Sequence, residues 1–247
     1  MKFCYINTNN TYPQDRHLID GLRENTHDVL ELEEKSQGLN KYIRIAKQFR
    51  SKKYPCDVII VGFTSPLFVP TLRCISSKKI IFNAAVSQYE ANIISRGLQS
   101  PWSLSALKWW IIDFISFHLS SIVLLESNAQ IDFVHKFFLV PRKKLVRAFA
   151  GVNEKEFFYD SAVEKNRKFT VLFRGRFLPE SGILTVIETA KKLENTDIQF
   201  LIIGHGFMYR EVNALMEKLA PENIEMINEK LPIEKLREKM LQCHISL

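Results

Sequence analysis

The stretch from Phe169 to Gly206 opens with Phe-Thr-Val-Leu-Phe-Arg-Gly-Arg-Phe-Leu-Pro-Glu-Ser-Gly (169–182) and closes with Phe-Leu-Ile-Ile-Gly-His-Gly (200–206). Its first residues, and those from Ile198 to Ile203, form short apolar and β-branched runs, which are typical of buried strands. The segment after Gly182 has an apolar face at helical spacing, made by Val186, Ile187, Ala190 and Leu193. The stretch therefore predicts a strand, a Gly-rich turn, a helix, a second strand and a second Gly-rich turn.

Small and basic residues follow both predicted strands: Gly175 and Arg176 the first, Gly204 and Gly206 the second. In an open parallel sheet, ligands bind beyond the carboxyl ends of the strands. Glycines there let a ligand approach backbone N–H groups at a helix start, and an arginine supplies charge for a phosphate. The plainer interpretation is a surface arginine and two tight turns. A dinucleotide fingerprint is absent, because Tyr209 stands where its last glycine would be.

The runs Gly-Arg-Phe-Leu-Pro-Glu-Ser-Gly (175–182) and Ile-Gly-His-Gly (203–206) resemble the donor-binding half of the family-four retaining glycosyltransferases. That family has Gly-Arg, a few residues, Pro-Glu-Lys-Gly and then Gly-x-Gly. The resemblance implies the GT-B architecture, a nucleotide-sugar donor and no metal or other cofactor. It implies donor-binding roles for Gly175, Arg176, Ser181, Gly204 and Gly206, with Arg176 on the diphosphate. Ser181 replaces the family's lysine and brings no charge.

Strands and helices alternate along the rest of the chain, which indicates doubly wound parallel sheets. The predicted fold is α/β and GT-B-like, with two Rossmann-type domains, the second incomplete. Residues 1–150 are the expected acceptor-side domain, 151–167 a linker and 168–247 a partial donor domain. The strands expected in the first domain are 2–7, 29–32, 57–62, 79–84, 121–125 and 145–149, and the helices are 15–24, 40–53, 66–74, 103–120 and one capped by Ser127.

The donor half holds about 80 residues, whereas domains of this kind are usually larger. In the resembled family a Glu-x7-Glu motif that holds the donor would come next, and a final helix would return to the first domain. The expectation is a donor domain truncated at Leu247. Since Ser181 also removes a cation, we expect this chain alone to be a poor transferase.

Composition limits the partners. The chain has 247 residues, a net charge of +7 and a pI of about 9.2, which favours acidic surfaces or phosphorylated ligands. No basic-aromatic motif accompanies the charge, so nucleic acid is not an expected partner. Cys4, Cys56, Cys74 and Cys243 form no Cys-x-x-Cys pair, and three of them adjoin core segments, which predicts buried thiols. The N-terminus reads as a strand rather than a signal peptide, so the expected location is cytoplasmic.

The turn after the first strand offers acceptor-side candidates: Tyr12, Asp15, Arg16 and His17. Ordinary helix capping by Asp15 explains that turn equally well. Three further acceptor-side candidates, Ser87, Tyr89 and Glu90, follow the fourth strand.

Many members of the resembled family place a histidine after the fourth strand, and no such histidine identifies a catalytic base here. A retaining mechanism needs little from a base, because the leaving phosphate can accept the acceptor's proton. Catalysis is then mostly positioning and stabilisation of the departing diphosphate.

Two stretches bear on membranes. The apolar run Trp102–Leu125 is interrupted by Lys108 and Asp113, so it predicts a buried helix and a core strand rather than a spanning helix. The second stretch, 41–53, is a helix whose Ile43, Ala46 and Phe49 are expected to face inward. Its cations predict either a solvated face or a dock for the anionic inner face of a membrane through Lys41, Arg44, Lys47 and Arg50.

The leading hypothesis is transfer of a hexose from a nucleotide sugar to a glycan, lipid-linked or small acceptor. A second hypothesis, from another class, is a non-catalytic pseudoenzyme or binding module that assists another transferase. A third is a doubly wound domain that binds some other phosphate ligand.

Overall fold

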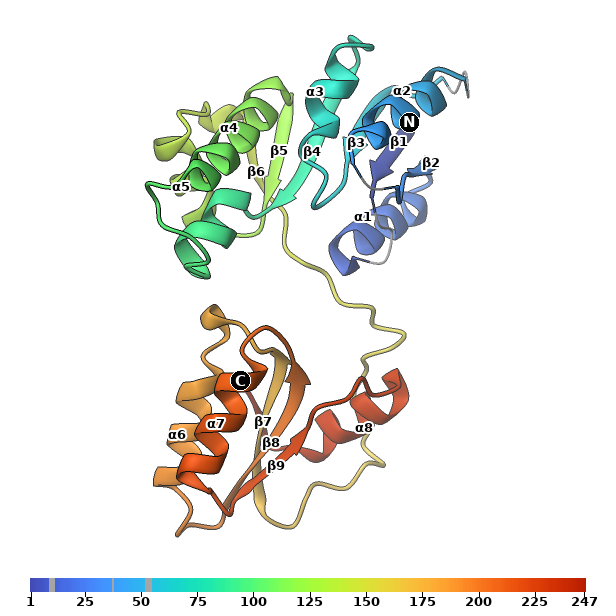
Figure 1. Ribbon diagram of the computed structural model, residues 1–247. Coiled ribbons are helices and arrows are strands. Elements are labelled where there is room, and N and C mark those ends of the chain that lie inside the picture. The colour runs from blue at the N-terminus through green and yellow to red at the C-terminus, as the bar shows by residue number, and fades with distance from the viewer. Residues whose placement is uncertain (9–11, 37, 52–54) are drawn as a thin grey trace. The chain divides into compact units, whose positions relative to one another are not determined.

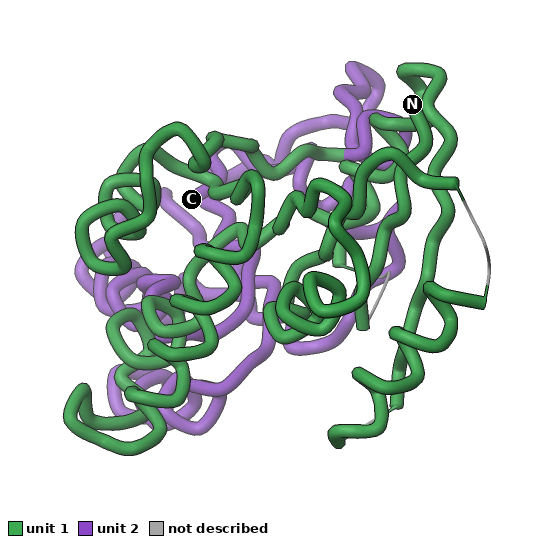
Figure 2. The backbone as a smooth tube through the Cα atoms, turned by 90° about the horizontal axis from the view of Figure 1, so that it is seen from above, with its two compact units in different colours: residues 1–152 green, residues 153–247 purple. Residues whose placement is uncertain are grey.

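The chain folds into two compact units. The computed structural model describes residues 1–8, 12–36, 38–51 and 55–247. Contacts between Cα atoms divide the chain into Met1–Val152, called unit 1, and Asn153–Leu247, called unit 2 (Figures 1 and 2). Each unit has its own parallel sheet and its own core, so each is described separately.

Unit 1 is built on a six-stranded sheet with the order β2-β1-β3-β4-β5-β6. Every pair of neighbouring strands in it is parallel. The order reverses beside β1, which creates a topological switch point at the carboxyl ends of β1 and β3. The strands are β1 (Lys2–Asn7), β2 (Asp28–Glu33), β3 (Val58–Val61), β4 (Lys79–Ala85), β5 (Ile122–Leu125) and β6 (Leu145–Arg147).

Helices cover the two faces of this sheet unequally. Ile19 of α1 packs with Phe3, Tyr5 and Ile60 on one face. The other face is covered by α2, α3, α4 and α5, whose apolar side chains form one cluster with β1, β3, β4 and β5. This division follows from right-handed crossovers, because only the β1–α1–β2 connection runs in the opposite direction along the sheet. The helices are α1 (Pro13–Glu24), α2 (Asn40–Ser51), α3 (Phe68–Arg73), the π-helical η1 (Glu90–Ser95), α4 (Leu104–Leu119), α5 (Asn128–Phe137) and the short η2 (Arg142–Lys144).

Unit 2 has a four-stranded parallel sheet with the order β10-β7-β8-β9. Helices α6 and α7 pack on one face with Phe173, Phe200 and Ile202, and α8 packs on the other with Leu172 and Leu201. The switch point of this sheet lies at the carboxyl ends of β7 and β10. The elements are β7 (Phe169–Arg176), η3 (Pro179–Ser181), α6 (Ile183–Lys192), β8 (Ile198–His205), α7 (Tyr209–Leu219), β9 (Ile224–Ile227), α8 (Ile233–Gln242) and β10 (Ile245–Ser246).

The segment expected to be a linker is irregular, and from Asn153 onward it belongs to unit 2. Phe157 packs against the apolar cluster beneath α8. The guanidinium carbon of Arg237 lies 4.1 Å from the centroid of the Phe158 ring, and the backbone N–H of Asn166 donates to the carbonyl of Gln242 at 2.9 Å. These contacts hold the segment against α8.

Most element types predicted from the pattern are confirmed. Ser127 caps α5 in a capping box with Gln130, and Cys4, Cys56 and Cys243 are buried free thiols, while Cys74 is exposed. The last residues of the chain form β10 beside β7. Helix η1 is not predicted by the periodicity, since its six residues are too short to show one. Lys52 and Lys53, included in the expected helix 40–53, lie outside the described residues.

Two predictions about helix faces are wrong. Ile43 of α2 is 57% exposed, whereas Ile45 is fully buried, because several phases of a short amphipathic run fit the same pattern. Phe49 packs against the core as predicted. The apolar stretch that begins at Trp102 does not form a buried helix. Helix α4 buries only one side, and the following large side chains are exposed: Trp102 by 96%, Leu104 by 86%, Leu107 by 53%, Ile111 by 42%, and Ile115 and Leu119 by 37% each.

Gly204 is required by the packing of β8 on β7. A Cβ at this position would lie 2.0 Å from the carbonyl oxygen of Gly175 and 2.9 Å from the Phe177 ring. We therefore expect Gly204→Ala to destabilise unit 2 by about 1–3 kcal/mol, the usual cost of overpacking. Urea unfolding followed by circular dichroism measures the change, and hydrogen exchange assigns it to unit 2.

Gly21→Ala is the matched control, because a Cβ on Gly21 meets nothing within 4 Å in the interior of α1. It should raise stability by roughly 0.5–1 kcal/mol. Equal stability of the Gly204→Ala chain and its parent would show that the two strands separate easily, against this account of the sheet.

Candidate functional site

The first candidate site lies at the carboxyl edge of the unit 2 sheet. Strands β7 and β8 run in register to their ends, where Gly175 pairs with Gly204 and Arg176 with His205. The backbone N–H of Phe177 donates to the carbonyl of His205 at 2.9 Å, and its carbonyl accepts from the N–H of Met208 at 3.0 Å. The Phe177 side chain is fully buried. The loops after the two strands are therefore joined through one anchored residue.

Two glycines at this edge are required by the close packing of the two loops. A Cβ on Gly206 would lie 2.7 Å from the backbone nitrogen of Phe177, and Gly204 faces Gly175 as described above. Both positions therefore need glycine for close approach of the protein's own backbone, whatever a ligand requires. Gly182 differs, because its φ of +70° is left-handed and a Cβ there would meet open space. It redirects the chain into α6.

The start of α6 leaves backbone donors available. Gly182 is its N-cap and supplies no side-chain acceptor, so among the described residues the N–H groups of the first turn have no side-chain cap. The hydroxyl of Ser181 donates to the carbonyl of Leu178 at 2.7 Å and accepts from the N–H of Leu178 at 3.3 Å. Arg176 is exposed at the end of β7. The edge thus combines uncapped N–H groups with a cation, while Ser181 is engaged within its own loop.

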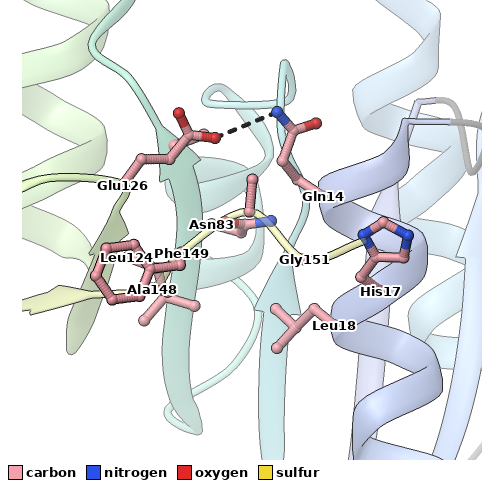
Figure 3. A pocket seen from close by; sticks show the side chains of 11 residues that line it. Gln14, His17, Leu18, Asn83, Leu124, Glu126, Ala148, Phe149 and Gly151 are labelled. Carbon is pink, nitrogen blue, oxygen red and sulfur yellow. Dashed lines mark hydrogen bonds between the residues drawn. The ribbon is translucent and has the colours of Figure 1, made fainter. Parts of the chain in front are cut away.

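The second candidate site is a cavity of about 210 Å³ at the carboxyl ends of β4, β5 and β6 in unit 1. Figure 3 shows Gln14 and Glu126 pointing toward each other, and the Gln14 amide donates to the Glu126 carboxylate at 3.2 Å. His17 lies beside Gly151, and its Nδ1 is buried and has no hydrogen-bond partner among the described residues. The full lining is Gln14, His17, Leu18, Asn83, Ala85, Leu124, Glu126, Ala148, Phe149, Ala150 and Gly151.

Sequence reasoning selected only His17 from this cavity. Gln14 and Glu126 were missed because nothing in their spacing links them, and they meet only when α1 and β5 adopt their places in the sheet. A usable signal was present nevertheless. Glu126 and the run Ala148–Gly151 directly follow β5 and β6, and residues just beyond parallel strands line one edge.

Asp15 does not cap α1. The N-cap is Tyr12, with no side-chain cap, and the Asp15 carboxylate has no exposed surface. It accepts hydrogen bonds from the Tyr5 hydroxyl at 2.6 Å, the Asn83 amide and the Phe63 N–H at 2.9 Å each, and the Asn7 amide at 3.2 Å. Burial raises the pKa of Asp15, against the lowering effect of these donors. Asp15 therefore ties β1, β4 and the segment after β3 together behind the cavity and cannot touch an acceptor in this conformation.

Ser87 is also buried rather than surface-facing. Its hydroxyl donates to the Asp113 carboxylate of α4 at 2.7 Å, and the N–H of Tyr89 donates to the same oxygen at 2.9 Å. The Tyr89 ring contacts the Phe137 ring at a centroid distance of 5.1 Å. Burial raises the pKa of Glu90, whose Oε2 is buried and has no hydrogen-bond partner within the described ranges. This cluster fixes the loop after β4 to α4.

The remaining candidates are dispersed. The Tyr12 ring packs edge-on against Phe63, and Arg16 pairs with Glu31 of β2 at 3.3 Å. Arg44, Lys47 and Arg50 are exposed on α2, and Lys41 lines a different cleft that is described below. Within the described ranges, no helix is long and apolar enough to cross a membrane, and no cluster of at least three His, Cys, Asp or Glu side chains is placed to hold a metal ion.

No protein-family model matches the chain, and no curated protein matches it by sequence. HepE from Anabaena, solved with UDP and glucose, matches 100% of this chain and 73% of its own length with a TM-score of 0.64 and 11% identity. The catalytic domain of starch synthase IV from Arabidopsis thaliana, bound to ADP and acarbose, matches 98% of this chain and 76% of its own length, with a TM-score of 0.68 and 9% identity. A putative UDP-N-acetylglucosamine 2-epimerase from Listeria monocytogenes matches 100% of this chain and 73% of its own length, with a TM-score of 0.58 and 10% identity.

The chain therefore has the fold of GT-B glycosyltransferases, with two parallel-sheet α/β domains of which the second sheet is smaller. At these identities the likeness establishes the fold. Because a putative epimerase shares it, the fold alone does not choose the reaction.

The buried Asp113 makes the stability of unit 1 depend on pH. Burial raises its pKa from 3.8 to about 7, so between these values the folded state keeps a proton that the unfolded state has lost. Stability therefore falls as pH rises through this window, by at most about 1.4 kcal/mol per pH unit. Burial also raises the pKa of Asp15 and Glu90, which adds a slope of the same sign.

We expect Asp113→Asn to reduce this slope between pH 5 and 7, because an amide does not titrate. Urea unfolding at several pH values measures this slope. Tryptophan fluorescence reports on unit 1, because all the tryptophans lie there. An unchanged slope would show that Asp113 is ionised in the folded chain throughout.

Proposed function

We propose that the chain binds a nucleotide sugar at the carboxyl edge of unit 2 and transfers the sugar to a glycan, lipid-linked or small acceptor bound by unit 1. The fold supports the class of reaction, since proteins with this fold were solved with UDP and glucose or with ADP and acarbose. The choice of transfer comes from the Gly-Arg and Pro-Glu-Ser-Gly runs (175–182), which resemble the donor loop of the glycosyltransferases.

One observation carries the donor site: Arg176 stands at the end of β7, and the first turn of α6 begins at Gly182 without a side-chain cap. Among the described residues, no ion pair is found for Arg176. A guanidinium and a helix N-terminus both favour a phosphate. The same groups would stabilise the negative charge that develops on a departing diphosphate, which is the main requirement of this reaction.

The unit 1 cavity supports the acceptor part of the proposal. Its amide, imidazole and carboxylate groups, from Gln14, His17 and Glu126, can donate to and accept from sugar hydroxyls. Saturation-transfer NMR with a panel of mono- and oligosaccharides tests this on the parent and the His17→Ala chain. Sugars that bind only the parent are expected, and identical spectra would remove the cavity from the proposal.

Arg176→Ala should weaken binding of UDP or ADP by about 1.5–3 kcal/mol, the range for hydrogen bonds to charged groups. Isothermal titration calorimetry measures the affinity. Arg167→Ala is the control, because Arg167 is exposed before the amino end of β7, at the opposite edge of the sheet. Equal affinities in the parent and both variants would exclude Arg176 from the donor site.

Ser181 favours a second candidate function, a binding module without turnover. Its hydroxyl is engaged with the Leu178 backbone, so it offers a diphosphate neither a charge nor a spare proton. A nucleotide would then be bound without strong stabilisation of the leaving group. Nucleotide binding without hydrolysis or transfer of any nucleotide sugar would identify this case, and turnover would identify the enzyme.

We expect Ser181→Lys to strengthen UDP or ADP binding by about 1.5 kcal/mol, because it places an ammonium group at the diphosphate. Ser181→Ala is the control, since it removes the same hydroxyl without adding charge. Calorimetry that finds the two variants equal would place the diphosphate elsewhere.

A further inference from the structure

Helix α4 presents an apolar ridge on the surface of unit 1. We use "α4 ridge" for its exposed side chains together with the preceding tryptophan: Trp102, Leu104, Leu107, Ile111, Ile115 and Leu119. The helical members recur at intervals of three or four residues and so share one side of the helix. Soluble proteins rarely leave a contiguous apolar strip of this length exposed, and such strips mark contact sites.

The α4 ridge is part of a firmly held helix. Ser103 caps its first turn by accepting from the N–H of Ala106 at 3.1 Å. Arg73 donates to the carbonyl of Leu119 at 2.9 Å, and Lys144 donates to that of His118 at 2.7 Å. Its inner side, including Ile112 and Phe117, is buried. The exposure is therefore a property of the folded unit rather than of a frayed segment.

A cationic cleft of about 220 Å³ borders the α4 ridge. Its lining includes Lys41, Lys108, Thr8, Thr64 and Ser65. The hydroxyl oxygens of Thr8 and Ser65 lie 3.2 Å apart, and Thr64 has a φ of +65°. That conformation is costly for a β-branched residue and is concentrated at ligand sites. The cleft lies at the carboxyl ends of β1 and β3, the switch point of the sheet.

The charges around the cleft have one sign. None of its lining residues is acidic, and in the part of the chain that the structure describes neither Lys41 nor Lys108 has an ion pair. The neighbouring α2 has no acidic residue, and the sole acid of α4, Asp113, is buried. An apolar ridge beside cations complements a surface that is apolar inside and anionic at its rim.

We propose that unit 1 docks on an anionic phospholipid bilayer through the α4 ridge, with a lipid phosphate in the cleft of Lys41 and Lys108. Lys108 lies on α4 itself, among Leu104, Leu107 and Ile111. Lipid phosphates and acyl chains occupy adjacent layers of a bilayer, so a cation beside exposed leucines matches that order. The exposed cations of α2, Arg44, Lys47 and Arg50, add attraction to the anionic headgroups.

A protein partner or a second copy of the chain fits less well. Stable protein interfaces deplete lysine at their centre, whereas Lys108 interrupts the α4 ridge. Two copies meeting through this ridge would also bring their Lys41 and Lys108 side chains together without acidic partners. The proposal does not depend on the sugar-transfer reaction, so binding to lipid and turnover can be tested separately.

Vesicle flotation tests the proposal with the full chain. Vesicles of phosphatidylcholine alone and of phosphatidylcholine with 30% phosphatidylglycerol are compared at low and high salt. The parent should float with the anionic vesicles at least tenfold more than with the neutral ones. Leu104→Ser with Ile111→Ser should lower that binding at least tenfold at both salt concentrations, because these side chains would enter the apolar layer. Lys41→Gln with Lys108→Gln should lower it about tenfold at low salt only.

Tyr159→Ser is the matched control, since Tyr159 is 80% exposed on unit 2 and should have no effect. Circular dichroism verifies that each variant is folded. No flotation of the parent, or equal flotation of parent and ridge variant, overturns the proposal. Loss of binding in high salt for the parent would assign docking to the cations without a contribution from the α4 ridge and also overturns it. A parent dimer that the ridge substitutions dissociate, without vesicle binding, would assign the ridge to a second copy instead.

Discussion

Every strand pair in both sheets is parallel, and this constraint arranges the rest of the molecule. A parallel strand can be reached only by a crossover along the sheet face, so a helix or an equivalent segment separates each strand from the next. The carboxyl ends of the strands then collect at one edge of each sheet. In unit 2 that edge holds Arg176 and Gly182, and in unit 1 it holds both the cavity of His17 and the cleft of Lys108.

Buried carboxylates hold the unit 1 edge together. Asp15 joins β1, β4 and the segment after β3 through four donors, and Asp113 joins α4 to the loop after β4. Burying a carboxylate is costly unless its acceptors are satisfied, and here the donors come from segments far apart in the chain. The loops that line the two hollows of unit 1 are therefore positioned by polar contacts behind them, while their own surface groups stay available for ligands.

In unit 2 the loops at the carboxyl edge of the sheet are positioned without a buried charge. Phe177 is anchored in the apolar core, and its backbone binds both His205 and Met208. The glycines at 204 and 206 permit this approach. Consequently, the sequence pattern that resembles a ligand-binding loop is explained in part by the packing of the protein on itself. The groups left to face a ligand are few, chiefly Arg176 and the start of α6.

The sequence by itself determined the elements, because hydrophobic periodicity is local: the strands at 2–7 and 169–173, the second of which continues to Arg176 in the structure, the capped helix after Ser127 and the two-domain α/β class all follow from it. Only the tertiary structure decided which side of a helix is covered. The pattern of α4 is apolar nearly all round, and its exposed side depends on what packs against it, just as the meeting of Gln14 with Glu126 depends on the strand order. Burial and long-range contact are properties of neighbours in space, and no spacing along the chain records them.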